Sequence, residues 1–219
     1  MVSGFLAQSA EFLPILLTGV KLTILITIGS LAVSTVLGLI WALMRVSGVR
    51  VLGAISRTII NIIRGIPIIV QLFYIYFVLP DFGITLSALQ AAIIGLGIAY
   101  SAYQAENFRA GIEAIDHGQV EAAQSIGMGW TLMMRRVILP QAIRIVLPPY
   151  GNTMIMMLKD SSQASTITVA ELALQGKLIA SATFQNSTVF TLVALLYLAM
   201  SIPLIIIVAS LEKRFGRKS

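Results

Sequence analysis

The sequence predicts an all-α integral membrane protein built as one domain over residues 1–219. Of its 219 residues, 58% are hydrophobic and only 11% are charged, whereas a soluble domain carries about 25% charged residues. Apolar stretches of roughly 20 residues, the length that crosses the hydrocarbon core as a helix, recur along the chain. Because they fill most of the sequence, no separate soluble domain is expected.

About five transmembrane helices are predicted, one for each long apolar stretch. In chain order these stretches cover residues 13–44, 59–79, 86–105, 137–158 and 189–211. Proline removes a backbone donor and kinks a helix. Pro67 therefore makes a break plausible in the second span, and the pair Pro148–Pro149 makes one plausible in the fourth.

Small residues recur every four positions along the first and third spans. They are Ser30, Ser34 and Gly38, followed by Ala91, Gly95 and Ala99. This spacing lets helix backbones approach closely in lipid. It predicts a tightly packed bundle without identifying which helices touch.

The basic residues predict the orientation of the spans. Twelve of the 15 Lys and Arg fall in three groups of four, at 45–64, 109–144 and 213–218, whereas the turn at 79–85 has none. By the positive-inside rule the N-terminus lies outside and the C-terminus inside. The net charge of +6 thus reflects topology, and no nucleic-acid partner is expected. With no cysteine, disulfides and cysteine metal sites are excluded, and no metal or cofactor is predicted.

Residues 118–131 interrupt the apolar pattern on the predicted cytoplasmic side. Gly118 interrupts the preceding helix, and Glu121 falls in the first turn of a new short helix, where an acid suits the helix dipole. Gly127 and Gly129 weaken this helix after about two turns. Both a solvated loop helix and a helix gripped by a cytoplasmic partner fit these residues.

This segment resembles the EAA signature of ATP-binding-cassette (ABC) importer permeases. The signature reads EAA, three residues, Gly, nine residues, Ile, one residue, Leu-Pro. The matching residues are Glu121, Ala122, Ala123, Gly127, Val137, Leu139 and Pro140, with Val137 where Ile is usual. Further motifs at 64–80, 99–115, 118–123 and 158–165 resemble the permease subunits of polar amino acid uptake systems over nearly the whole chain. Asp116–His117 and Gln163 depart from the usual pattern.

The resemblance implies a type I ABC importer permease with N-terminus outside and C-terminus inside. Glu121, Ala122, Ala123 and Gly127 would belong to a coupling helix that docks on a separate ATP-hydrolysing subunit. A solute-binding protein would deliver the amino acid from outside. Five spans are few to enclose a path, so a second permease, identical or different, is expected. The protein would lie in the bacterial cytoplasmic (inner) membrane.

The chain is not predicted to be an enzyme. It has no G-x-x-x-x-G-K-[ST] phosphate loop, because the pair Gly176–Lys177 has Glu171 where the first glycine is required. No nucleophile–base pair or metal cluster favours a membrane enzyme. The alternative is an ion-coupled secondary amino acid transporter that uses Glu106 and Asp160 as relays. Such a transporter would usually show inverted repeats, which the sequence lacks.

Polar residues within the spans mark the candidate substrate path, since such groups usually face a bundle interior. An amino acid is a zwitterion, so its path needs an acid for the ammonium group and donors for the carboxylate. The candidates are Asp160 and Glu106 as acids, with Asn152, Asn107, Ser161, Ser162 and Gln163 as hydrogen-bonding groups. Structural ion pairs with Arg109 and with Lys159 are the alternative roles for the two acids.

Span lengths place Glu106 and Asp160 near opposite membrane faces unless a helix is broken. The stretch 161–185 is too polar to cross the membrane. It predicts an outward-side helix or gate on which a solute-binding protein could dock.

Overall fold

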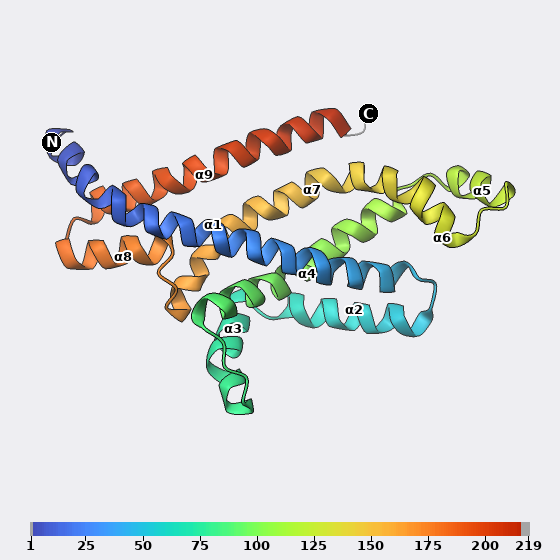
Figure 1. Cartoon of the computed structure of the whole chain (residues 1–219), viewed down its shortest axis with the longest axis horizontal. Helices are drawn as coiled ribbons and strands as arrows, with labels where there is room; N and C mark the ends of the chain where they lie inside the picture. The colour runs from blue at the N-terminus through green and yellow to red at the C-terminus, as the bar shows by residue number, and fades with distance from the viewer. Residues whose placement is uncertain (1, 216–219) are drawn as a thin grey trace.

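A computed structural model describes residues 2–215, with side chains from residue 8 onward. This part of the chain is almost entirely helical and contains no strand. Four long helices form the body of the bundle: α1 (Val2–Val46), α4 (Ala88–Glu113), α7 (Leu139–Asp160) and α9 (Asn186–Phe215). They run along its long axis, with the N-terminus at one end and α5 (His117–Ser125) at the other (Figure 1). The predicted all-α class is confirmed.

The second predicted span is broken into pieces. α2 (Arg50–Gly65) runs beside the second half of α1, and α3 (Ile68–Phe73) then turns away from the bundle (Figure 1). The π-helix η1 (Tyr74–Val78) and the 3₁₀-helix η2 (Leu79–Phe82) complete this arm. The bend between α2 and the arm is 98°.

By length and composition, α1 and α9 are candidate membrane spans, and α2 with its bent arm is a third candidate among the described residues. α4 and α7 are long enough, at 26 and 22 residues, but carry more polar side chains. The count of five spans and their orientation remain predictions.

The two proline predictions have different outcomes. Pro67 is the N-cap of α3 and follows an extended Ile66, and Gln71 Nε2 donates to the freed carbonyls of Ile63 and Ile66 at 2.9 and 2.8 Å. The break at Pro148–Pro149 is not observed, because α7 continues through both prolines. Adjacent prolines remove only two neighbouring helix bonds, and α7 is held on either side by α4 and α9.

The first and third predicted spans pack on each other as α1 and α4. Ser30 Oγ donates to the Ile93 carbonyl at 3.1 Å. A Cβ added to Gly38 would lie 2.7 Å from the Cβ of Gln104, so this approach requires glycine. The small residues predicted to allow close packing therefore do so here, although Gly95 faces Leu72 of α3.

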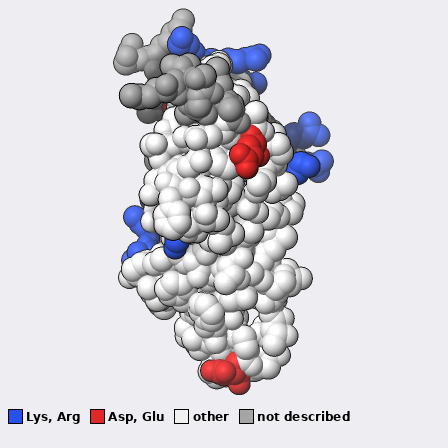
Figure 2. All heavy atoms as spheres, turned by 90° about the vertical axis from the view of Figure 1, so that its left-hand side faces the viewer, with Lys and Arg blue, Asp and Glu red and all other residues white. Residues whose placement is uncertain are grey.

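The outside of the bundle is apolar. Large side chains such as Ile28, Val36 and Ile206 are more than half exposed on α1 and α9. The end of the molecule that carries the N-terminus and α8 (Leu172–Thr183) shows mostly uncharged surface, with charges in a few separate clusters (Figure 2). Lipid covers surface of this kind in a multi-pass membrane protein.

Candidate functional site

The predicted coupling helix is α5, which lies at the end of the bundle with α6 (Trp130–Met133) (Figure 1). It begins one residue earlier than expected, at His117, and ends at Ser125 rather than near residue 131. Glu121 therefore lies in its second turn, and the expectation of an acid in the first turn is wrong. The Asp116 side chain accepts a hydrogen bond from the Gly118 amide at 2.7 Å and caps the helix. An aspartate at this position satisfies one of the unpaired amides of the first turn. Asp116, which departs from the family pattern, therefore serves as the N-cap of α5.

Gly127 ends α5, as predicted, in a left-handed conformation with φ +78°. The Gly127 amide donates to the Gln124 carbonyl at 2.9 Å, and the Met128 amide donates to the Ala123 carbonyl at 3.0 Å. This pair of bonds is a Schellman motif, which favours glycine because a Cβ is strained at positive φ. The glycine of the signature therefore defines where the helix stops.

The signature residues divide between two faces of α5. Ala123 is only 4% exposed and packs in a cluster with Ile115, Met133 and Met134. Glu121, Ala122 and Gly127 are exposed. Ala123 therefore attaches the helix to the domain, and the other three residues form a surface open to a partner.

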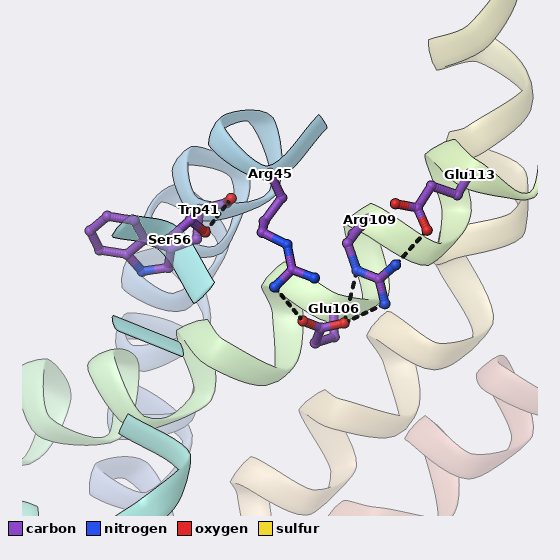
Figure 3. A network of polar contacts seen from close by, with 6 residues as sticks. All are labelled: Trp41, Arg45, Ser56, Glu106, Arg109 and Glu113. Atoms are coloured by element: carbon purple, nitrogen blue, oxygen red, sulfur yellow. Dashed lines mark hydrogen bonds and ion pairs between the residues drawn. The ribbon is translucent and has the colours of Figure 1, made fainter. Parts of the chain in front are cut away.

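Glu106 lies in an ion-pair network at the same end of the bundle (Figure 3). Arg109 donates to its Oε2 through Nη2 at 2.6 Å and Nε at 2.9 Å, and also pairs with Glu113. Arg45, from the end of α1, lies 3.7 Å from the other carboxylate oxygen. Two cations thus hold Glu106, which favours the structural alternative that the sequence left open.

Asp160 has different surroundings. Its Oδ2 accepts a hydrogen bond of 2.7 Å from the hydroxyl of Tyr100, which is 1% exposed. Asp160 itself is half-buried, and Lys159 is exposed. Within the described part of the chain neither Lys159 nor another cation forms an ion pair with Asp160.

The contact with Tyr100 places Asp160 deep in the bundle. Tyr100 follows the first residue of α4 by twelve positions, which is about 18 Å of helix. Glu106 lies only six residues further on, or about 9 Å. The expectation that the two acids lie near opposite faces is therefore corrected: α7 ends beside the middle of α4, without any break at its prolines.

The residues after Asp160 form the 3₁₀-helix η4 (Ser161–Ile167). Ser161 Oγ donates to the Leu158 carbonyl at 2.7 Å, and Ser162 Oγ donates to the Lys159 carbonyl at 2.8 Å. Ser162 and Gln163 are half-buried, whereas Ser161 is fully buried. The structure thus keeps three predicted ligand residues next to Asp160 in one tight helical turn.

The two predicted asparagines lie elsewhere. Asn107 Nδ2 donates to Thr153 Oγ1 at 3.0 Å and to Gln104 Oε1 at 3.1 Å, and so joins α4 to α7. Asn152 is exposed and donates to Glu212 Oε1 on α9 at 3.1 Å. Neither amide contacts Asp160 within the described structure.

The polar stretch 161–185 begins inside the bundle, and its place on the outward side of the membrane stays a prediction. Ala164 and Ile167 of η4 are fully buried in the core cluster that also contains Tyr100. Only α8 lies at the end of the bundle beside the N-terminus (Figure 1). Internal hydrogen bonds of the serine hydroxyls let this polar sequence enter the core.

Sequence reasoning missed Glu171, which has no exposed surface. Its carboxylate accepts hydrogen bonds from the Ala173 and Leu174 amides, both at 2.9 Å, from the Tyr197 hydroxyl at 2.9 Å and from Thr23 Oγ1 at 3.4 Å. It caps α8 and joins that helix to α1 and α9. An acid directly before an apolar helix was the available signal.

Comparison of the chain with known proteins identifies its family. Residues 34–217 match the binding-protein-dependent transport system inner membrane component family. The chain is 40% identical over 206 residues to the probable amino-acid ABC transporter permease protein YckA of Bacillus subtilis (strain 168), covering 94% of this chain and 91% of the relative. It is 44% identical over 162 residues to the L-cystine transport system permease protein TcyB of the same organism, covering 74% and 69%.

Solved structures agree on the fold. A crystal structure of an amino acid ABC transporter with histidines matches with a TM-score of 0.88 and 37% identity, covering 96% of this chain and 98% of that one. An inward-facing structure of the MetNI methionine ABC transporter matches with a TM-score of 0.78 at 23% identity and supports the fold alone. The chain belongs to the family of binding-protein-dependent transport system inner membrane components, as a multi-pass inner-membrane permease of the amino acid ABC transporter type.

Proposed function

We propose that this chain is the transmembrane subunit of an importer that carries an amino acid into the cytoplasm. ATP hydrolysis on a separate ABC subunit drives the transport, and an extracytoplasmic solute-binding protein delivers the substrate. The observation that carries this proposal is α5. Its exposed Glu121 and Ala122, with Ala123 packed beneath them, form a short rigid helix at one end of the bundle.

The substrate interacts with Asp160 through its ammonium group. This acid lies beside the middle of α4 and is satisfied only by the Tyr100 hydroxyl in the described structure. A carboxylate forms strong charge-assisted hydrogen bonds with an ammonium donor. Gln163 and the hydroxyls of Ser161 and Ser162 follow it directly. Relatives named for L-cystine and glutamine transport support an amino acid as the substrate class.

The remaining predicted site residues have supporting roles in this proposal. Asn107 holds α4 against α7, Asn152 meets α9, and Glu106 belongs to the ion-pair network. Both carboxylate oxygens of Glu106 are already engaged by arginines, so this residue has little free capacity for the ion relay that a secondary transporter would need. A second permease, identical or different, completes the path.

The test of coupling is charge reversal on α5. Glu121→Lys should leave the chain inserted in the membrane while weakening association with the ATPase subunit and lowering amino acid uptake. Gly127→Asp should do the same, because its φ of +78° strains any residue with a Cβ. The matched control is Glu11→Lys, an equal charge reversal on the exposed surface at the other end of the molecule. Normal pull-down of the ATPase by both α5 variants, with undiminished uptake, would refute the proposal.

The proposed orientation has the N-terminus outside and the C-terminus inside. The chain has no cysteine, so single cysteines can report it directly. Asp81→Cys at the tip of the arm should react with an impermeant maleimide from outside, whereas Val49→Cys between α1 and α2 should react only after permeabilisation. Both positions are exposed. Labelling of both from the same side would overturn this orientation.

A further inference from the structure

α2 carries three arginines at intervals of seven residues: Arg50, Arg57 and Arg64. This interval places them on one face of the helix, and all three are exposed. The ion pairs of the described chain use Arg45 and Arg109, so no arginine of α2 has an acidic partner there. The positive-inside pattern groups all three with Arg45 on the predicted cytoplasmic side.

Arg64 differs because, although exposed, it lies beside the inner part of α4 rather than near an end of that helix. Its guanidinium carbon is 5.6 Å from the centre of the Tyr103 ring on α4. Tyr103 follows the first residue of α4 by fifteen positions and precedes the last by ten, or about 22 and 15 Å. A charged group at such depth normally faces water or an opposite charge rather than lipid. The Tyr103 ring is attracted to the cation without neutralising it.

A continuous row of side chains connects Arg64 with Asp160. The rings of Tyr103 and Tyr100 are 5.7 Å apart, and the Tyr100 hydroxyl donates to Asp160 at 2.7 Å. An unpaired cation and an acid without a cation thus flank two tyrosines on one helix. These are the two charges that a zwitterion requires, held by α2 and α7 beside two tyrosines of α4.

We propose that Arg64 binds the α-carboxylate of the amino acid after it leaves Asp160 and moves toward the cytoplasm. This inference rests on the proposed function and adds a second, cationic station to the same path. A guanidinium binds a carboxylate through two parallel hydrogen bonds, which a lysine ammonium cannot reproduce. Arg57 and Arg50 continue the positive face toward the cytoplasmic end of α2, each about 10 Å further on.

The experiment uses the permease assembled with its ATPase in proteoliposomes, with the solute-binding protein loaded with its amino acid outside. Uptake and ATP hydrolysis are measured together for Arg64→Gln, Arg64→Lys and the control Arg144→Gln, which removes an exposed arginine from α7. Loss of a charged hydrogen-bonding partner should lower uptake per ATP by about tenfold in Arg64→Gln. ATP hydrolysis stimulated by the loaded binding protein should stay within about twofold. Arg64→Lys should be intermediate, and Arg144→Gln unchanged.

Several results would overturn this inference. One is an unchanged ratio of uptake to hydrolysis in Arg64→Gln. Another is a parallel loss of both activities in Arg64→Gln and Arg64→Lys, which would assign Arg64 to the stability of the fold. If Arg64→Gln does not assemble, the ratio in Arg64→Lys decides. A defect seen only in vesicles that contain anionic lipid would assign Arg64 to a lipid phosphate. Absence of amino acid uptake by the wild-type complex would refute the proposed function instead.

Discussion

Tyr100, which donates to Asp160, precedes Glu106 by about 9 Å along α4, yet the surroundings of the two acids are opposite. Glu106 is held by Arg109 at 2.6 Å and by Arg45 at 3.7 Å, so two cations depend on it (Figure 3). Asp160 accepts one hydrogen bond from Tyr100 and has no cation partner in the described part of the chain. Removing the Glu106 carboxylate would leave Arg45 and Arg109 without their acidic partner, whereas removing the Asp160 carboxylate would leave only the Tyr100 hydroxyl without its acceptor.

The comparison separates a structural acid from one that can serve a ligand. A carboxylate surrounded by donors and cations has little capacity left for a ligand ammonium. Glu171 extends the comparison, because its four hydrogen bonds come from three elements and it is completely buried. The expected loss of stability therefore falls from Glu171 through Glu106 to Asp160. The loss of transport should not follow this order, because Asp160 is the acid proposed to contact the substrate.

The largest loss of stability is expected for Glu171→Gln, at about 3 kcal/mol. Every group around this carboxylate is a donor, so the amide NH₂ of glutamine would face donors and leave some unpaired. The measurement is the thermal midpoint of the purified permease, compared with Glu11→Gln at an exposed acid. Equal midpoints for the two variants would show that the buried carboxylate is not needed.

Glu106→Gln should cost about 2 kcal/mol, less than a fully buried pair because the site is partly exposed. The loss leaves Arg45 and Arg109 without their shared acid. The double variant Glu106→Gln/Arg109→Gln should recover part of the stability, since one stranded cation is removed with the acid. A double variant less stable than the sum of the two single changes would contradict the proposed network.

Asp160→Asn should cost at most about 1 kcal/mol, because the amide oxygen can still accept from Tyr100. Uptake should nevertheless fall about tenfold, since an amide matches an ammonium donor less well than a carboxylate does. Yield and ATPase association should be normal, as in Asp81→Asn at the tip of the arm. Unchanged rates across cationic, neutral and acidic amino acids would remove Asp160 from the site.

The smallest loss of stability is expected for Arg45→Gln, at about 0.5 kcal/mol. Its contact with Glu106 is longer than that of Arg109 and lacks a hydrogen bond within the described geometry. Arg109→Gln should therefore be clearly more destabilising than Arg45→Gln under the same melting conditions. The reverse order would mean that α1 contributes more to the network than its distance indicates.

The sequence by itself determined the features that depend on neighbouring residues. Apolar runs predicted the membrane helices, of which α1 and α9 are long and apolar enough to cross a membrane. Pro67 and Gly127 marked a break and a helix end that the structure confirms. The pairing of Glu106 with Arg109 also follows from spacing, because side chains three residues apart lie on one helix face. Each of these signals is local, so no knowledge of helix packing was required.

Only the tertiary structure decided which distant residues meet. Arg45 reaches Glu106 from another helix, and Arg64 lies over Tyr103. Asp160 meets Tyr100 because α7 ends beside the middle of α4. The lengths of the predicted spans placed Asp160 near the membrane face opposite Glu106. In the structure the chain continues after Asp160 into η4, which is buried, so α7 ends inside the bundle rather than at its end. Distances between helices depend on how their side chains interlock, and that is set by the whole bundle rather than by any single segment.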